Sequence, residues 1–381
     1  MINQYKICNR CIYDSTVPNI SFNSQNICNY CDQHDELEKE YPLGADGKKK
    51  LELLINQIKK AGRKKKYDCV IGVSGGCDSS FLLYKLVSYG LRPLAVHFDN
   101  TWNSAISTMN IAKVTSKLGI DLFTYVVDNK EYDEIYKAFL LSGVPDIEAP
   151  TDIGIATTQY LAAAKYNIKY IIEGHSFRTE GISPLGWLYM DGKYIQSVIK
   201  NYSNQKIKTF PNLTLFKQLK WMVLNRFKRV RPLYYMDYNK KLAMEILKDK
   251  FNWEWYGGHH LENQFTAFYH RYFMPKKFAI DQRLLGYAAL TRSGQIIRDD
   301  ALEMMKASPS GQEIDEILYL VKKRLCYSDN EFQSIMNIAK KNYKDFKTYK
   351  KTFEKLKPFF YIMYKLDLVP KSFYIKYTKS D

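Results

Sequence analysis

Residues 70–80 read Val-Ile-Gly-Val-Ser-Gly-Gly-Cys-Asp-Ser-Ser, and this stretch decides the fold. An apolar run leads directly into Ser74-Gly75-Gly76-Cys77-Asp78-Ser79, in the order expected of a strand, a tight turn and a helix start. Two adjacent glycines carry no Cβ, so the backbone can turn sharply and direct several N–H groups at one anion. The helix expected from about Asp78 adds its positive N-terminal end. The stretch therefore predicts a phosphate-binding loop.

This loop lacks one residue of the common nucleotide-binding loop. That loop reads Gly-x-x-x-x-Gly-Lys-Ser/Thr and places its lysine on the terminal phosphates. No lysine follows Gly75 and Gly76 at the corresponding place. The alternative interpretation is a Gly/Ser-rich turn that only caps a helix, but the order of strand, glycine pair and Asp78 favours phosphate binding.

The flanking sequence predicts an α/β fold with a parallel sheet and helices on both faces. Strand patterns at 68–73, 92–98, 121–127 and 168–173 alternate with helix patterns at 78–89, 103–118, 131–141 and 154–166. Ligands of such sheets bind at the carboxyl ends of the strands. Besides the loop, the segments expected there are His97-Phe98-Asp99-Asn100, Asp128 and Gly174-His175-Ser176.

Composition indicates a globular protein with an anionic partner. The chain has 381 residues, 46% of them hydrophobic, and a formal net charge of +17. This charge suits nucleic acid, a nucleotide-linked substrate or an acidic membrane surface. We see no signal peptide and no apolar run long enough to cross a membrane, so we expect a cytoplasmic protein.

Four of the seven cysteines form two pairs, Cys8-x-x-Cys11 and Cys28-x-x-Cys31, separated by sixteen residues. Two such knuckles can offer four thiolates to one tetrahedral ion, so the spacing predicts a structural Zn²⁺ site. A disulfide framework does not fit a reducing cytosol. Cys69 and Cys326 are expected to be core thiols, and Cys77 is expected to have no catalytic role.

We divide the chain into four regions. Residues 1–45 form the cysteine-bearing module, and 46–190 form the nucleotide-binding domain. Residues 191–310 form a substrate-binding region with a basic insertion, and 311–381 form a helical tail rich in Lys and aromatic residues. The insertion, 192–236, has ten Lys or Arg and no Asp or Glu. It could face the substrate, a partner subunit or a membrane surface, or it could be a solvated basic helix.

The chain as a whole resembles the N-acetyl sugar amidotransferases of bacterial lipopolysaccharide and surface-polysaccharide biosynthesis, within the PP-loop ATP pyrophosphatases. The resemblance runs from the first cysteine to about residue 305. It rests on both cysteine pairs, on 67–80 and 90–103, and on a more distinctive set of later motifs. These are Arg231-Pro-Leu233, His259-His260-x-Glu262, Thr266, Tyr269, Pro275-Lys276-Lys277-Phe278 and Asp281-x-Arg283.

The resemblance implies conversion of an acetamido group on a nucleotide-linked or acidic sugar into an acetamidino group. ATP would adenylate the amide oxygen with release of pyrophosphate, and ammonia would then displace AMP. Implied cofactors are ATP, Mg²⁺ and Zn²⁺. Implied catalytic residues are Ser74, Asp78, Ser79 and His175. The nucleotide would contact Ser74, Gly75, Gly76, Asp78, Ser79, Ser80, His97, Phe98, Asp99 and Gly174, with Asp78 either binding Mg²⁺ or capping the helix.

The sugar needs cationic and hydrogen-bonding groups outside the ATP site. Our candidates are Arg178, His259, His260, Glu262, Lys276, Lys277 and Arg283. Arginine is the better bidentate partner for a carboxylate, so Arg178 and Arg283 are preferred. The alternative for Arg283 is a structural pair with Asp281 or Glu262.

The chain shows no cysteine nucleophile of its own for releasing ammonia from glutamine. Position 2 is Ile, and no Gly-x-Cys-x-Gly occurs. The resemblance therefore implies a partner glutaminase and a barrel subunit akin to that of imidazole glycerol phosphate synthase. Basic segments could add peripheral membrane contact, and we expect no nucleic-acid partner. The sequence does not define the oligomeric state.

Two other interpretations remain open. A tRNA thiolation enzyme can also join a zinc ribbon to a pyrophosphate loop, and the positive charge suits RNA. Such enzymes usually need a close cysteine pair at the active site, whereas only Cys69, Cys77 and Cys326 lie outside the ribbon. The other is a non-catalytic scaffold that binds zinc and nucleotide, but the loop shows no sign of degeneration.

Overall fold

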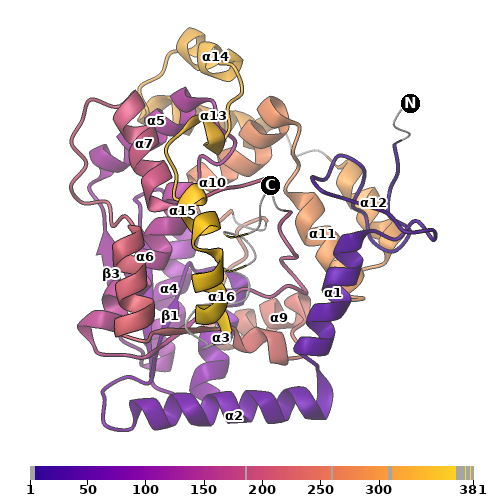
Figure 1. The fold of residues 1–381 in the computed structure, drawn as a ribbon, viewed down its shortest axis with the longest axis vertical. Helices are drawn as coiled ribbons and strands as arrows, with labels where there is room; N and C mark the ends of the chain where they lie inside the picture. Colours follow the sequence, from indigo (N-terminus) through magenta and orange to yellow (C-terminus); the bar gives the residue numbers. More distant parts are fainter. Residues whose placement is uncertain are drawn as a thin grey trace.

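A computed structural model describes residues 5–184, 187–258, 261–307 and 311–365, together with Tyr374 and Thr378. Its centre is a five-stranded parallel sheet in the order β3-β2-β1-β4-β5 (Figure 1). The strands are β1 (Cys69–Gly72), β2 (Pro93–Asp99), β3 (Leu122–Val126), β4 (Tyr170–Ile172) and β5 (Lys228–Val230). The order reverses direction between β1 and β4, which is the switch point where open α/β sheets bind ligands.

Helices cover both faces of this sheet, as predicted. Side chains of β1 alternate between the faces: Val70 packs into one core, while Cys69 and Ile71 pack into the other. The Val70 core includes α5 (Asn129–Ser142), α6 (Ala149–Lys165) and α7 (Gly192–Tyr202). The opposite core includes α2 (Gly44–Gly62), α3 (Cys77–Ser88), α4 (Ala105–Leu118) and α9 (Lys240–Phe251).

The N-terminal cysteine module packs against elements from late in the chain. Its apolar residues share a core with Trp187, Leu284, Ala288 and Ala301. In Figure 1, α1 (Asn29–Glu40) rises from the end of α2 toward α11 (Arg283–Arg292) and α12 (Arg298–Lys306). The N-terminal module and helices from the second half of the chain therefore form one structural unit.

The C-terminal half is mainly helical, as predicted. It contains α10 (Gln264–Phe268), a π-helical segment η3 (Tyr269–Phe278), α13 (Gly311–Arg324), α14 (Asp329–Asn337), a 3₁₀ turn η4 (Tyr343–Asp345), α15 (Lys350–Lys355) and α16 (Lys357–Lys365). Phe353, Phe360 and Met363 of α15 and α16 pack with Met222. Within the described residues, no helix combines the length and hydropathy needed to cross a bilayer.

The sequence analysis predicted that the basic segment at 192–236 is an insertion. In the structure, part of this segment belongs to the sheet. It holds α7, α8 (Leu215–Leu219), η1 (Lys220–Leu224), β5 and the 3₁₀ turn η2 (Pro232–Tyr235). β5 pairs with β4, and Arg229 and Arg231 both form ion pairs with Glu173, the residue after β4. This largely buried carboxylate pairs with two of the ten cations, offsets one of their charges and lets a cationic strand complete the sheet.

Candidate active site and metal centre

The predicted phosphate-binding loop connects β1 to α3 at the switch point. Gly75 has φ of +79°, and a Cβ there would lie 2.2 Å from the backbone oxygen of Ser107. Only glycine fits this conformation and this close approach. Gly76 is the N-cap of α3, its N–H donates to Ser74 Oγ (3.3 Å), and no side chain caps the helix. The loop thus has the backbone geometry of an anion-binding turn.

Neighbouring elements hold the loop in place from outside. The Gly75 carbonyl accepts hydrogen bonds from Trp253 Nε1 (2.9 Å) and from Asn110 Nδ2 (3.3 Å). On the other side, a Cβ at Gly174 would lie 3.5 Å from the Cα of Ser79, in the first turn of α3. The end of β4 therefore lies against the helix start, at the site predicted for the nucleotide.

The three serines of the loop, Ser74, Ser79 and Ser80, differ in exposure. Ser79 Oγ lies 3.5 Å from Ser74 Oγ, and both hydroxyls are only partly buried. Ser80 is 3% exposed, and its backbone N–H donates to the Gly76 carbonyl. Ser74 and Ser79 are thus better placed than Ser80 to offer hydroxyl groups to a ligand.

Three carboxylates surround the loop. Asp78 is in the first turn of α3, Glu180 follows β4, and Glu262 Oε1 lies 3.3 Å from where a Gly76 Cβ would be. Burial raises the pKa of Glu180 well above its usual value, and the charge and hydrogen bonding of Asp78 add to this shift. Asp78 and Glu180 are therefore close enough to interact, and carboxylate oxygens are the ligands that a hard cation such as Mg²⁺ prefers.

Asp78 also contacts residues from the C-terminal half. The Tyr238 hydroxyl donates to Asp78, and Lys240 Nζ lies 3.8 Å from its other oxygen. Gly76 occupies the N-cap position of α3, and Asp78 lies in the first turn of the helix. Asp78 is therefore not the N-cap residue.

Cys77 lies beneath the loop, 3.6 Å from the Tyr238 hydroxyl. Burial raises the pKa of this thiol to about 12, with a further contribution from Asp78. A protonated, buried thiol is a poor nucleophile. The environment is consistent with the expected absence of a catalytic role.

The residues at the end of β2 are internally hydrogen-bonded. His97 is 7% exposed, its Nδ1 lies 2.9 Å from the Val73 carbonyl, and its Nε2 lies 3.2 Å from Asn103 Nδ2. Burial lowers its pKa, so the ring is neutral, and this network assigns the proton to Nδ1. Asp99 Oδ1 accepts from the Thr101 N–H and from Asn103, and Phe98 packs on Gly154 of α6. These residues lie at the edge of the predicted nucleotide site.

His175 follows β4 and faces the carboxylate group. Its Nδ1 lies 3.0 Å from the Tyr234 hydroxyl, and its Nε2 lies 3.7 Å from Glu180. The ring is 38% exposed. It is therefore a polar group at the open side of the site, consistent with the predicted position near the phosphates.

Three of the cations predicted to bind the sugar are engaged in internal contacts. Arg178 forms a bidentate pair with Glu38 of α1 and also donates to two backbone carbonyls. Lys277 Nζ donates to the carbonyls of Ile335, Met336 and Ile338 at the end of α14. Arg283 pairs with Asp281 and reaches the carbonyls of Met305 and Ala307. This geometry argues against a substrate role for all three.

The remaining sugar-binding candidates differ in position. Lys276 is exposed on η3, and Glu262 lies at the loop. His259 and His260 lie outside the described residues. Sequence reasoning missed Glu180, Tyr238 and Lys240, because no local pattern marks them and only the fold brings them to Asp78.

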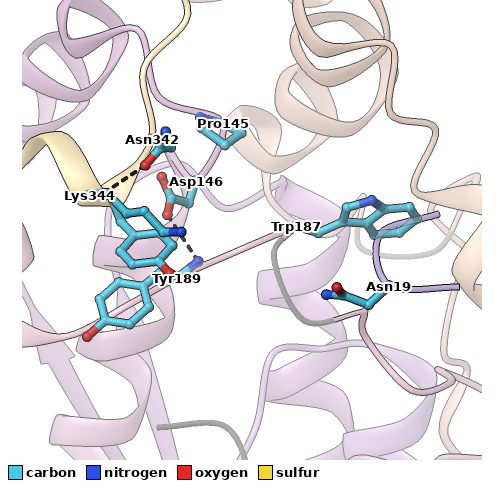
Figure 2. A pocket seen from close by; sticks show the side chains of 8 residues that line it. Asn19, Pro145, Asp146, Trp187, Tyr189, Asn342 and Lys344 are labelled. Atoms are coloured by element: carbon cyan, nitrogen blue, oxygen red, sulfur yellow. Dashed lines mark hydrogen bonds between the residues drawn. The ribbon is translucent and has the colours of Figure 1, made fainter. Parts of the chain in front are cut away.

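A pocket lies apart from this site (Figure 2). Asp146 and Tyr189 lie within it, beside Asn342 and Lys344 on one side and Trp187 with Asn19 on the other. The Tyr189 N–H donates to Asp146 (3.1 Å), and the Tyr189 and Tyr343 rings stack at 4.2 Å. The cysteine module, the α/β region and the C-terminal helices thus meet at this pocket.

The four cysteines of the predicted metal site lie together. Their sulfurs are all within 4.8 Å of one another and buried, with Cys8–Cys31, Cys11–Cys28 and Cys28–Cys31 separations of 3.8, 3.7 and 3.6 Å. One ion bound tetrahedrally at about 2.3 Å places thiolates about 3.8 Å apart. A [4Fe-4S] cluster binds each cysteine to a different iron, which separates the sulfurs further. The geometry suits a single four-coordinate ion.

Two arginines of the C-terminal half lie against this cluster. Arg292 is 6% exposed, donates to Cys11 Sγ (3.2 Å) and stacks over the Tyr13 ring at 4.2 Å. Arg298 Nε donates to the carbonyls of Cys8 and Cys11. A guanidinium beside four thiolates offsets their negative charge, so α11 and α12 support the metal centre.

The sheet order and the loop at the switch point define a parallel α/β protein with an anion-binding turn at the carboxyl end of its sheet. Residues 262–357 match the family model for "LPS biosynthesis protein WbpG-like, C-terminal domain". The matched segment, the WbpG-like domain, begins at Glu262 beside the loop and runs through α10 to α15. The match extends beyond residue 305, where the resemblance in sequence was expected to end.

Comparison with solved structures finds partial similarity. NMN synthetase from Francisella tularensis is 19% identical, with 54% of this chain and 93% of that chain covered at a TM-score of 0.27. The U34-tRNA thiolase NcsA from Methanococcus maripaludis, solved with its [4Fe-4S] cluster, is 14% identical, with 85% and 89% covered at 0.30. These scores are too low to carry a functional inference. No relative is found among curated proteins.

Proposed function

We propose that this protein is an ATP-dependent amidotransferase that converts an acetamido group of a nucleotide-linked or acidic sugar into an acetamidino group. One observation carries the proposal. Glu262, the first residue of the WbpG-like domain, lies against Gly76 of the phosphate-binding loop. A nucleotide site and a domain characteristic of lipopolysaccharide biosynthesis thus share one surface.

The loop and the first turn of α3 would bind the phosphates of ATP. Ser74 and Ser79 offer hydroxyls, and the turn with positive φ at Gly75 directs N–H groups toward the anion. Negative charge develops on the pyrophosphate as it leaves. Hydrogen-bond donors that are already positioned there lower the barrier to adenylation. His175, on the open side, would contact the phosphate that becomes AMP.

Asp78 and Glu180 would hold Mg²⁺. The electrostatics of these two residues is consistent with a cation between them. The charge of Asp78 contributes to the raised pKa of Glu180, and a divalent cation removes the repulsion between the two carboxylates. Bound there, Mg²⁺ supplies positive charge to the phosphate oxygens. Zn²⁺ would occupy the Cys8–Cys11–Cys28–Cys31 centre and has a structural role, because the ribbon packs on α11 and α12 rather than at the loop.

Ammonia would come from a partner glutaminase and pass through a barrel-type subunit. Outside the ribbon, the described cysteines are Cys69 and Cys77, which are buried, and the exposed Cys326. Cys69 and Cys77 have raised pKa values caused first by burial. Thiolation needs reactive sulfur at the site, so these environments favour amidotransfer over the tRNA thiolation alternative.

The test measures ATP-dependent release of AMP and pyrophosphate. We expect release with a diacetamido nucleotide sugar and ammonium chloride, and none with unmodified tRNA. Asp78→Asn and Ser74→Ala should each lower the rate at least 100-fold without lowering the melting temperature, since both side chains serve a ligand. Ser88→Ala, at the far end of α3, is the matched control. Release of AMP and pyrophosphate with tRNA but not with the sugar would contradict the proposal and favour the tRNA thiolation hypothesis.

A further inference from the structure

Exposed apolar side chains gather on two segments that pack together, residues 215–224 (α8 and η1) and residues 349–365 (α15 and α16). Within the described residues, these segments hold six of the eighteen large hydrophobic side chains that are exposed to solvent. The six are between 41% and 78% exposed: Phe216, Leu224, Leu356, Phe359, Tyr361 and Ile362. Scattered apolar residues are normal on a protein surface, whereas a group of them marks an interaction site.

The packing of α16 accounts for its exposed residues. Phe360 and Met363, three positions apart, are buried in a cluster with Met222 of η1. Phe359 and Ile362 directly precede them in sequence, so they form a second row about 100° away around the helix. Both side chains of this row are exposed, and α16 lies at the front of the view in Figure 1. The contacts that fix α16 on the protein therefore leave an apolar row in solvent.

The two segments also carry an excess of positive charge. Their exposed lysines are Lys217, Lys220, Lys351, Lys355, Lys357 and Lys365. The only acidic residue in 215–226 and 349–365 is Glu354, which pairs with the buried Lys350 (3.7 Å). Lys365 Nζ lies 5.5 Å from the centroid of the exposed Tyr361 ring. Apolar and cationic side chains are thus interleaved on one part of the surface.

This combination fits an anionic lipid bilayer. A lysine can lay its apolar stem along the protein and extend its ammonium group to lipid phosphates, while apolar side chains enter the headgroup region. Protein interfaces are instead enriched in arginine and depleted in lysine, but Arg226 is the only arginine in these segments. Single-stranded nucleic acid stacks its bases on aromatic rings, and the aliphatic Leu224, Leu356 and Ile362 have no such ring.

We propose that the surface formed by residues 215–224 and 349–365 docks the protein on an anionic phospholipid bilayer. Phe359 and Ile362 enter the headgroup region, and the surrounding lysines contact lipid phosphates. The association is peripheral and depends on ionic strength, because salt screens the attraction between exposed lysines and the lipid surface. The inference is independent of the proposed amidotransferase chemistry, since no residue of the phosphate-binding loop takes part.

Vesicle flotation tests the docking. The wild-type protein should bind vesicles of phosphatidylglycerol and phosphatidylcholine at least about tenfold more tightly than vesicles of phosphatidylcholine alone, since each lysine near an anionic surface contributes about fivefold in affinity. The double variant Phe359→Ser, Ile362→Ser should lower this affinity by about tenfold or more, because two apolar side chains no longer enter the lipid. Both side chains are exposed, so the melting temperature should stay at the wild-type value.

The matched control removes one aromatic residue and one isoleucine from elsewhere on the surface. Tyr319 is 63% exposed and Ile297 is 70% exposed, so Tyr319→Ser with Ile297→Ser should bind vesicles like the wild type. Hydrogen exchange of the wild-type protein gives evidence that needs no variant. Anionic vesicles should slow exchange in α16 (Lys357–Lys365) and leave α12 (Arg298–Lys306) unchanged.

Three results would overturn the proposal. The first is equal vesicle binding by the wild type and the double variant, with no protection of α16. The second is a lower molar mass of the double variant in light scattering without lipid, which would assign the surface to contact between copies of this chain. The third is wild-type binding to single-stranded RNA in place of vesicles, lost in the double variant.

Discussion

Glu173 is a buried carboxylate paired with Arg229 and Arg231, and it makes the stability of the protein depend on pH. Burial alone would raise its pKa, but the two arginines dominate and lower the pKa to about 2. A folded-state pKa below the unfolded value of about 4.5 contributes stability above pH 4.5, and this contribution is lost as the pH falls toward 2. It amounts to about 3 kcal/mol at neutral pH.

Glu173→Gln removes this contribution, so it should lower the free energy of unfolding by about 3 kcal/mol at pH 7. The substitution also leaves Arg229 and Arg231 without their charged partner. The difference from wild type should shrink below pH 4.5. Urea denaturation at pH 7 and pH 3 measures it. Glu245→Gln, on the exposed face of α9, should change neither value. A constant difference at both pH values would show that the effect does not come from the ionised carboxylate.

Arg283 gives a second prediction at this scale. Its contacts to Asp281 and to the carbonyls at the C-terminal end of α12 are those of a structural residue. Arg283→Lys loses the bidentate geometry, so we expect destabilisation of about 1 kcal/mol and equal effects on the KM values for sugar and ATP. Thermal unfolding and steady-state kinetics measure both. Lys276→Ala, which removes an exposed cation, is the comparison. A rise in the sugar KM alone for Arg283→Lys would indicate instead that Arg283 binds the substrate.

Single residues show what the sequence could predict. The backbone demands of Gly75 are local, so the loop could be predicted from eleven consecutive residues. The partner of a long cationic side chain is decided by tertiary packing. Arg178 and Glu38 are 140 positions apart and contact each other only in the fold. The contacts of Arg178 and Lys277 therefore could not be derived from sequence. The pair of Arg283 with Asp281, only two positions away, is the alternative that the sequence did offer.

At the scale of elements, the metal centre connects the ribbon to α11 and α12. Cys28→Ser should abolish stoichiometric zinc and lower the melting temperature by several degrees, since a structural zinc site contributes directly to folding. Hydrogen exchange should rise in Arg283–Arg292 and Arg298–Lys306, because Arg292 and Arg298 lose a rigid partner. Elemental analysis and exchange mass spectrometry measure these effects.

Cys326→Ser is the matched control, because Cys326 is exposed and outside the cluster. It should bind one zinc per chain and unfold at the wild-type temperature. Faster exchange confined to the ribbon itself in Cys28→Ser would contradict the coupling. Iron with visible absorbance in the wild-type protein would contradict zinc.

The strands show why periodicity succeeds for some elements and fails for others. The four predicted strands are confirmed within two residues, because each is an apolar run bounded by turn residues. β5 was missed because it reads Lys228-Arg229-Val230, and the charge of Arg229 is offset by Glu173, the residue after β4. α6 begins at Ala149, five residues before its predicted start, with Pro150 in its first turn.

For the whole molecule, the fold class followed from the order of strands and helices, whereas the site did not. The carboxylates around Asp78 come from the loop, from the segment after β4 and from the start of the WbpG-like domain. No local pattern relates these three segments. Their proximity depends on the packing of α9 and α10 against the sheet, which only the folded chain defines.

The contact between Cys11 and Arg292 spans 281 positions, and this has a consequence for biosynthesis. Translation proceeds at about 5–20 residues per second, so the ribbon leaves the ribosome roughly 15–60 s before α11 does. During that interval its apolar surface and its four thiols have no protein partner. Early capture of zinc would protect those thiols from oxidation and organise the ribbon before its docking surface exists. Zinc supply during translation, more than the stability of the finished protein, would then limit the yield of correctly assembled chains.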